Sequence, residues 1–598
     1  MQKLSSRQLL LLVFVFGYAG VFAIDYASDV LAHSPVLDAR ENLALAAQID
    51  AGQLAQEPFY RAMLYPWLLS ILPEASRALF AAFFGLVFHF GNAALCGLLA
   101  YELWRRPAAA WFAGVLYSIY PVSLFFAVQV LDITPAITLF LAGCWTLLRG
   151  ARISNRWLGA LAGLCGGLAV LLRPNLLPAV LLYPLVFAWL KYRTKAPFGS
   201  MVPDGLIVAV PLLICAGLQG GFNAYRSGEV RILPWQGSYN LYAANRPGAN
   251  GKYFEQQIAF ADVPVGANTT RMESERLYQA GAGDEAPQTV AAMNRYWRGL
   301  LFREVWEDPA AWLALMGRKV VYLLNNWEQY NNLTYAFHKA RFTALAWNPL
   351  GWGLLLMGAA LALALNRSSC CSRREVLALA AIGLAYAAGV LMFFVSARFR
   401  LPLAPLLVVF AGGLACVNWR DLRRCDVIAG GCILAVTAGL SFGNWLGAQD
   451  KKTFRQDHLL LAQAALNVGD DEAALLHTTE ALELAPEMQS AVSLQVVALF
   501  NLWLEASPAD QDVLWSQLSQ ALQRQSGGGP AVYFIRGVYL WRTADPEGAR
   551  AVWREALRRF PEGAEANRAA LEWVSPESAR APSPRSQQIG KLLPLESR

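Results

Sequence analysis

Long apolar runs separated by short polar connections occupy the first three quarters of the chain. A helix that crosses a bilayer needs about 20 mostly apolar residues. The first run, after Lys3 and Arg7, has a poor cleavage site, so we interpret it as a retained anchor and not as a signal peptide. The pattern predicts eleven spans, at 8–24, 77–101, 108–128, 133–148, 157–172, 175–190, 202–222, 348–365, 375–396, 402–418 and 427–447.

The distribution of Lys and Arg gives the orientation of these spans. With a cytoplasmic N-terminus, every alternate connection is basic, and the cytoplasmic segments hold sixteen basic residues against five acidic ones. The spans 157–172 and 175–190 are kept separate, because merging them would move three basic loops outside. Three regions then face outward, namely the loop 25–76, the long loop 223–347 and the tail from 448.

Composition agrees with a membrane protein. The 598 residues are 56% hydrophobic and 16% charged, whereas a soluble domain carries about 25% charge. The net charge of +7 comes from the cytoplasmic connections, because the outer loops are balanced and the tail is mildly acidic. The basic excess therefore reflects topology, and a nucleic-acid partner is not expected.

The tail carries two similar segments, 457–486 and 530–561. Small residues Ala474 and Ala481 precede Pro486, and Ala549 and Ala556 precede Pro561 at matching offsets. These segments resemble tetratricopeptide repeats, whose small residues let antiparallel helices pack closely. We expect a helical domain over 448–574, with a degenerate repeat near 490–525, and a disordered end over 575–598. The domain is expected to dock a protein partner, and a helical cap without a partner is the alternative.

The first outer loop holds a candidate catalytic carboxylate. Asp38 begins a short amphipathic helix, and Glu41 follows three residues later. That spacing is also typical of a capping box, which would give both carboxylates a structural role. From the residues alone, capping and catalysis both remain open.

The second part of this loop reads EPFYRAMLYPWLL and leads into the next span. Its aromatic residues, among them Tyr60 and Tyr65, are typical interfacial anchors. Arg61 lies between them and is a candidate for binding a phosphate.

Several segments together resemble the polytopic GT-C glycosyltransferases, in particular the group related to protein O-mannosyltransferases and the lipid A aminoarabinose transferase. SPVLDAREN places Asp38 where this family has its key catalytic acid, and VLDITP offers Asp132 between the third and fourth spans. GLAVLLRPN, with Arg173, resembles the family's Gly-rich fifth span, and SARFRLPL contains Arg398 and Arg400. WQGSYNLYAANRPGANG and NNWEQYNN resemble pieces of bacterial members, and the resemblance covers 1–447 in order.

The resemblance implies transfer of a sugar, with inversion, from a polyprenyl-phosphate donor at the outer face of a bacterial inner membrane, with the C-terminal domain periplasmic. Asp38 would be the general base and Asp132 a second catalytic residue. The acceptor, a glycan, lipid or protein, is not identified. The residues expected to bind the donor phosphate are Arg61, Arg173, Arg398 and Arg400. Those expected to contact substrate are Glu41, Tyr60, Tyr65, Tyr239, Asn245 and Glu328.

Each of these residues also has a structural alternative. Asp132 could cap the fourth span or bind a metal. The arginines could be snorkelling helix ends or lipid anchors, and the aromatic residues of 223–347 could form the core of that loop. The nine cysteines fall in spans or cytoplasmic loops, and the five histidines are scattered, so we expect no disulfide outside and no zinc centre. No cofactor is expected to be required, and a divalent ion stays an alternative.

Two other functions compete with transfer. One is a transporter or flippase for lipid-linked glycans, although no internal repeat of the kind common in transporters is visible. The other is a non-enzymatic membrane scaffold that presents the helical tail.

Overall fold

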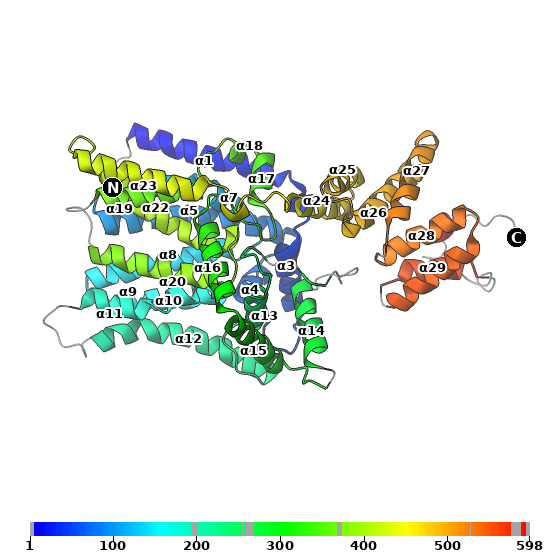
Figure 1. Cartoon of the computed structure of the whole chain (residues 1–598), viewed down its shortest axis with the longest axis horizontal. Helices are drawn as coiled ribbons and strands as arrows, with labels where there is room; N and C mark the ends of the chain where they lie inside the picture. Colours follow the sequence, from blue (N-terminus) through cyan, green and yellow to red (C-terminus); the bar gives the residue numbers. More distant parts are fainter. Residues whose placement is uncertain are drawn as a thin grey trace. The chain divides into compact units, whose positions relative to one another are not determined.

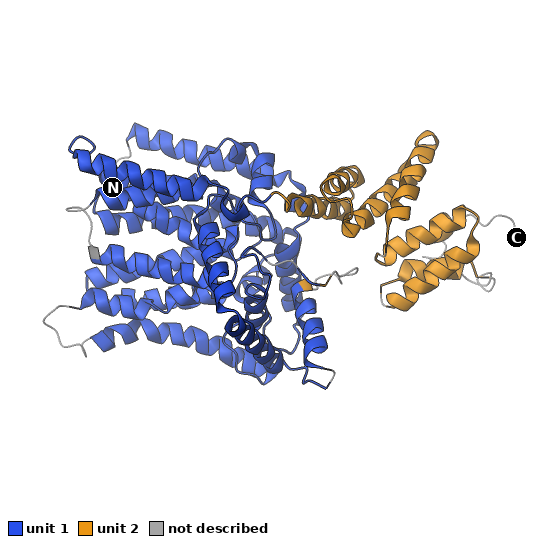
Figure 2. Ribbon diagram, viewed as in Figure 1, with its two compact units in different colours: residues 1–257, 270–450 blue, residues 258–269, 451–598 orange. Residues whose placement is uncertain are grey.

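The computed structural model describes residues 5–192, 201–253, 256–258, 268–283, 285–366, 373–526, 528–561, 563–575 and 588–593. Within these ranges the chain is helical and has no strand, apart from an isolated bridge between Asn331 and Leu333. The chain divides into two compact units (Figure 2). Unit 1 comprises Met1–Gln257 and Thr270–Asp450, and unit 2 comprises Ile258–Thr269 and Lys451–Arg598.

Unit 1 contains the helices that are compatible with a multi-pass membrane protein. Among the described residues, eight helical segments are long and apolar enough to cross a membrane. They are α1 (Ser6–Ala27), Glu74–Trp104 with α5 (Arg77–Trp104), α8 (Ile133–Arg152), Pro174–Lys191 with α10 (Leu177–Val180) and α11 (Tyr183–Lys191), α12 (Met201–Ser227), α20 (Arg373–Met392), Ala397–Cys416 with α21 (Ala397–Arg400) and α22 (Ala404–Ala411), and α23 (Arg424–Phe442). Figure 1 shows the long helices of this unit running in similar directions.

The other three predicted spans differ from the expectation of simple long helices. The span 108–128 is two helices, α6 (Pro107–Ser118) and α7 (Pro121–Ala127), bent by 57°. Pro121 explains the break, because proline lacks an N–H group and disfavours a helical residue before it. The spans 157–172 and 348–365 form α9 (Arg156–Leu172) and α19 (Trp352–Leu365), which have 17 and 14 residues and are shorter than a full crossing.

Helix α9 is packed between its neighbours in spite of its length. It contacts α8 and α12, and Gly163 lies directly against α12. A Cβ atom at Gly163 would lie 2.0 Å from the carbonyl oxygen of Val208, so only glycine allows this approach. The chain then breaks at Arg173, before Pro174, as the sequence predicts.

The remaining helices of unit 1 lie in the segments that connect the long ones, mainly 25–76 and 223–347. They are α2 (Val30–His33), α3 (Leu37–Asp50), α4 (Leu64–Ser70), α13 (Gln236–Ala243), α14 (Thr269–Ala282), α15 (Val290–Glu307), α16 (Pro309–Leu324), α17 (Tyr335–Arg341) and α18 (Thr343–Ala346). The loop 223–347 has an aromatic core of its own, in which Trp235, Tyr239, Tyr242 and Trp297 are buried together. Burial of several aromatic side chains makes this region a packed body and not a plain connector.

In its described residues, unit 2 contains seven helices. They are α24 (Phe454–Val468), α25 (Asp471–Leu484), α26 (Gln489–Glu505), α27 (Pro508–Arg524), α28 (Pro530–Arg542), α29 (Pro546–Arg559) and α30 (Glu565–Trp573). Neighbouring helices pack on one another from α24 to α27 and from α28 to α30, and α28 packs on α26. The small residues singled out in the sequence, Ala474, Ala481, Ala549 and Ala556, are fully buried. Helices α26 and α27 fill the interval 490–525, where a further repeat was expected.

Some of the predicted features fall on residues that are not described. These include the basic loop residues Arg193, Lys195 and Arg367, and most of the tail 575–598. Within that tail, residues 588–593 are described, and Ile589 and Leu593 are buried in the core of unit 2.

Candidate functional site

Helix α3 presents Asp38 in a position that is not a cap. The N-cap of α3 is Val36, which makes no side-chain cap, so Asp38 lies inside the first turn. The capping-box alternative for Asp38 and Glu41 is therefore wrong, and their carboxylates are bound by arginines instead. Leu37, directly before Asp38, has a φ of +51°, which is uncommon for a bulky residue. Such strain tends to collect at functional sites.

Two arginines from distant parts of the chain pair with carboxylates of this helix, and a third arginine contacts one of them. Arg398 on α21 places its Nη1 atom 2.5 Å from Oδ2 of Asp38. Arg61, which precedes α4, has its Nη1 atom 3.6 Å from Oδ1 of Asp38 and also pairs with Glu41. Arg173, at the end of α9, donates from Nη2 to the backbone carbonyl of Arg398 at 3.4 Å.

The second predicted catalytic carboxylate joins the same group. Asp132 occupies the N-cap position of α8 but makes no side-chain cap, and its Oδ1 atom lies 3.0 Å from Nη1 of Arg173. The charge of Asp132 also acts on Arg61. We call Asp38, Glu41, Arg61, Asp132, Arg173 and Arg398 the Asp38 cluster. It holds three carboxylates and three guanidinium groups.

The environment keeps Asp38 ionised. Burial alone raises the pKa of this carboxyl, but the charges of Arg398 and Arg61, with hydrogen bonds from Arg398 and Asn332, outweigh burial. The pKa of Asp38 therefore lies well below its usual range. Its side chain is still 21% exposed, so an incoming molecule can reach it.

Two arginines of the cluster each have a hydrogen-bond donor without an acceptor. In the described part of the chain, Nε of Arg173 and Nε of Arg398 are buried and have no hydrogen-bond partner. Both guanidinium groups lie over the ring of Phe399, at 5.2 and 5.8 Å from its centroid. Two such donors beside one accessible carboxylate make this cluster a candidate for binding an anionic ligand.

Tyr65 and Tyr60 border the cluster. Tyr65 on α4 is buried near Asp132, and burial together with that charge raises the pKa of its hydroxyl far above the usual range, so it stays a neutral donor. Tyr60 lies edge-on to Trp235, with ring centroids 4.6 Å apart, and belongs to the aromatic core of the outer loop. Tyr60 is also within reach of the charges of Glu41 and Arg61.

Two neighbouring asparagines complete the surroundings of Asp38. The side chain of Asn332 hydrogen-bonds to Asp38, and Asn331 accepts from Nη2 of Arg398 at 3.3 Å. Asn331 in turn donates to the hydroxyl of Ser396 at 3.1 Å. The segment NNWEQYNN singled these residues out, but nothing in the sequence assigned them to Asp38, because they lie almost 300 residues away.

Arg400 and Glu328 pair with each other outside the cluster. Nε of Arg400 lies 3.0 Å from Oε2 of Glu328, and both residues are almost completely buried. The guanidinium also donates to the backbone carbonyls of Tyr322, Leu323, Asn325 and Trp327. With its donors engaged inside the fold, Arg400 is better explained as a structural residue than as a phosphate ligand. We carry neither Arg400 nor Glu328 into the proposed site.

Tyr239 and Asn245 likewise lie within the packed region formed by 223–347. Tyr239 packs on Trp297, with ring centroids 4.8 Å apart, and is 2% exposed. The side chain of Asn245 donates to the carbonyls of Leu241 and Met392, and accepts from Nζ of Lys319 at 2.9 Å. These contacts favour the alternative in which aromatic and amide groups of this loop build its own core.

Comparison with protein-family models, curated proteins and solved structures finds no match to this chain. The resemblance to GT-C enzymes therefore depends on the motifs in the sequence. The geometry of the Asp38 cluster is an independent observation, since it comes from the contacts alone.

Proposed function

We propose that the chain is a membrane glycosyltransferase of the GT-C type, which moves a sugar from a polyprenyl-phosphate carrier to an acceptor hydroxyl. The observation that carries this proposal is the pair of buried, unpartnered Nε–H groups of Arg173 and Arg398 beside an ionised Asp38. Guanidinium groups suit a phosphate because their planar fork donates two hydrogen bonds at once.

In the proposed reaction, the carboxylate of Asp38 and the arginines of the cluster have different roles. The acceptor oxygen attacks the anomeric carbon, the bond from that carbon to the phosphate oxygen breaks, and the carrier leaves as polyprenyl phosphate. Asp38 takes the acceptor's proton, and one base is sufficient for inversion. Arg173, Arg398 and Arg61 stabilise the charge that develops on the leaving phosphate.

Donor binding would also change the basicity of Asp38. In the described contacts, Arg398 and Arg61 are held by carboxylates and keep the pKa of Asp38 low. A donor phosphate that draws these arginines toward itself weakens their hold on Asp38, and the pKa of Asp38 then rises toward a value suited to a base. In this proposal the site becomes a good base only when the donor is present.

The remaining architecture fits such an enzyme. The helices of unit 1 are compatible with a membrane body. The basic connections in the sequence support a cytoplasmic N-terminus. Asp132 orients the acceptor or assists Asp38, held by Arg173 at 3.0 Å. Unit 2, whose buried small residues are typical of tetratricopeptide-like hairpins, serves as a docking surface on the outer side of the membrane.

The test uses the full-length chain in lipid nanodiscs with a panel of polyprenyl-phosphate-linked hexoses and pentoses, and with membrane extract as the source of acceptor. Release of polyprenyl phosphate is the readout, so the acceptor need not be known. Asp38→Asn is expected to lower the rate by about 10²–10⁴-fold, the usual contribution of a positioned general base. Glu74→Gln, an exposed carboxylate in the same outer loop, is the matched control and should leave the rate unchanged. Full activity in a folded Asp38→Asn protein would overturn the mechanism.

A further inference from the structure

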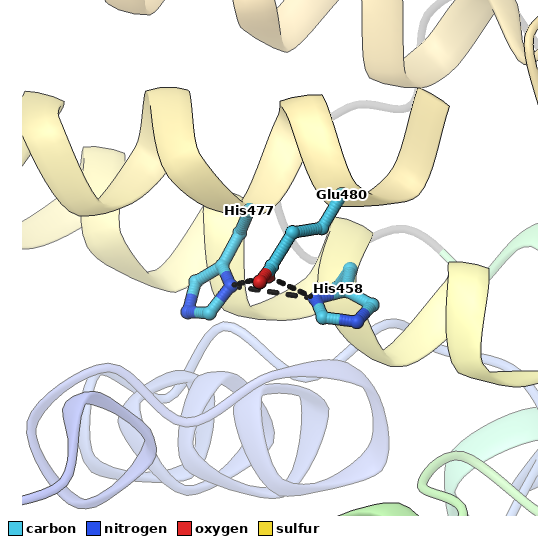
Figure 3. A group of neighbouring side chains, drawn as sticks. All are labelled: His458, His477 and Glu480. Carbon is cyan, nitrogen blue, oxygen red and sulfur yellow. Dashed lines mark hydrogen bonds and ion pairs between the residues drawn. The ribbon is translucent and has the colours of Figure 1, made fainter. Parts of the chain in front are cut away.

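Unit 2 brings two of the five histidines of the chain together with a glutamate (Figure 3). His458 is on α24, and His477 and Glu480 are three residues apart on α25. Nδ1 of His458 lies 2.8 Å from Oε2 of Glu480, and Nδ1 of His477 lies 3.0 Å from the same oxygen. The two Nδ1 atoms are 3.4 Å apart.

This arrangement is awkward for hydrogen bonds alone. Both imidazoles turn the same nitrogen toward one carboxylate oxygen and toward each other (Figure 3). If both Nδ1 atoms carry a proton, two N–H groups face one another at short range. If either lacks a proton, its lone pair faces a carboxylate oxygen. A cation at the centre removes both conflicts, because nitrogen and oxygen lone pairs then all point at positive charge.

The distances also suit a transition metal. Zinc lies about 2.0–2.2 Å from nitrogen and oxygen ligands. The circle through the three ligand atoms has a radius of about 1.8 Å, so an ion at bonding distance from all three fits about 1 Å off their plane. Two imidazoles and one carboxylate are a set that binds zinc and its neighbours in the first transition row, and not the oxygen-only set that calcium or magnesium prefers.

We infer that His458, His477 and Glu480 form a binding site for a divalent transition metal of the Zn²⁺ class. The side chains are 14%, 20% and 41% exposed, so an ion can enter from solvent and a water molecule can take the fourth position. The ligands come from two consecutive helices, so the bound metal fastens α24 to α25 at the start of the helical unit. This inference does not depend on the proposed glycosyl transfer.

The spacing of the histidines does not predict this site. His458 and His477 are nineteen residues apart and lack the short spacing of familiar zinc motifs. Packing of α24 against α25 brings the two imidazoles together.

The test measures Zn²⁺ binding to the metal-stripped full-length chain in detergent, by equilibrium dialysis and elemental analysis. We expect one Zn²⁺ per chain for the natural protein and loss of that ion in His458→Ala and in His477→Ala. Glu480→Gln should bind at least about tenfold more weakly. His33→Ala is the matched control, because His33 is an exposed histidine outside this group, and it should bind as the natural protein does.

A second measurement guards against a variant that simply fails to fold. Zn²⁺ is expected to raise the Tm of the natural protein and of His33→Ala, but not of His477→Ala, since a ligand that binds the folded state stabilises it. Equal stoichiometry in His477→Ala and the natural protein would overturn the inference. So would the absence of any Zn²⁺-dependent rise in the Tm of the natural protein at pH 7.5.

Discussion

Arg398 and Arg400 lie on the same short helix, α21, but their surroundings differ. Those of Arg398 suit ligand binding, whereas those of Arg400 suit a structural role. Both arginines are buried and both pair with a carboxylate. Around Arg400, the carboxylate of Glu328 and four backbone carbonyls receive the guanidinium donors. Around Arg398, the partner Asp38 is partly exposed and Nε has no partner in the described part of the chain.

The difference shows how to recognise a binding cation. A buried guanidinium whose donors all end on the protein stabilises its own loop and has nothing left for a ligand. A buried guanidinium with an N–H group that lacks an acceptor has an unfavourable desolvation free energy. An anion bound beside the accessible carboxylate would accept this hydrogen bond and offset that cost. Substitutions at Arg400, Lys319 and Arg398 test this contrast.

The Arg400 region predicts a large loss of stability. Arg400→Met leaves Glu328 buried without its cation, and breaking such a pair costs about 3–5 kcal/mol. We expect poor recovery of folded protein and a much lower Tm, measured by thermal unfolding in detergent. Arg398→Met, two residues away, should lower the Tm less, because its partner Asp38 is partly exposed and still has Arg61 nearby.

A double variant sharpens this prediction. Arg400→Met combined with Glu328→Met removes both charges, so the desolvation cost of an unpaired carboxylate disappears and part of the lost stability should return. If Arg400→Met alone melts as the natural protein does, the assignment of this pair to the fold is wrong.

Lys319 offers a third buried cation, without a carboxylate. Its Nζ atom donates to the amide oxygen of Asn245 at 2.9 Å and to the carbonyl of Phe393 at 2.5 Å, and burial lowers the pKa of its ammonium to about 7. The unfolded chain keeps the proton up to about pH 10, whereas the folded chain loses it above pH 7. Stability should therefore rise from pH 7 toward pH 10, by at most about 1.4 kcal/mol per pH unit.

The measurement compares Tm at pH 7, 8 and 9 for the natural protein and for Lys319→Met. The variant should lack the part of the rise that comes from Lys319, so the difference in Tm between the two proteins should change with pH. A constant difference in Tm across this range would show that burial does not neutralise Lys319. Lys319 would then stay charged in the folded protein, as the carboxylate-paired Arg400 does.

Much of the fold follows from local pattern, and the site follows only in part. The apolar runs predict the helices, and Pro174 marks the break beside Arg173, because these effects act within a few residues. The bend at Pro121 was missed, since 108–128 is apolar throughout. The motifs also singled out Asp38, Asp132 and Arg173, which the fold brings together.

What the sequence could not give is the direction of side chains and the pairing of distant segments. Arg398 and Arg400 belong to one motif, and only the turn of α21 sends them to different carboxylates. Asn332 hydrogen-bonds to Asp38 although the two residues are almost 300 positions apart in the sequence. Tyr239 is of a residue type that often contacts sugars, yet its neighbours enclose it in a core. An aromatic ring suits either environment, so the residue type alone could not decide between them.

The mildest substitution addresses the Arg398 side of the contrast. Arg398→Lys keeps the charge beside Asp38 but removes the planar fork and the idle Nε–H group. If that group binds the donor phosphate, the KM for the polyprenyl-phosphate sugar should rise by about tenfold, the loss of one charge-assisted hydrogen bond. The Tm should stay near that of the natural protein, because Lys can still pair with Asp38. An unchanged KM, measured with the same panel of donors, would mean that the Nε–H group of Arg398 does not bind the phosphate. Arg398 and Arg400 would then differ only in their contacts within the fold.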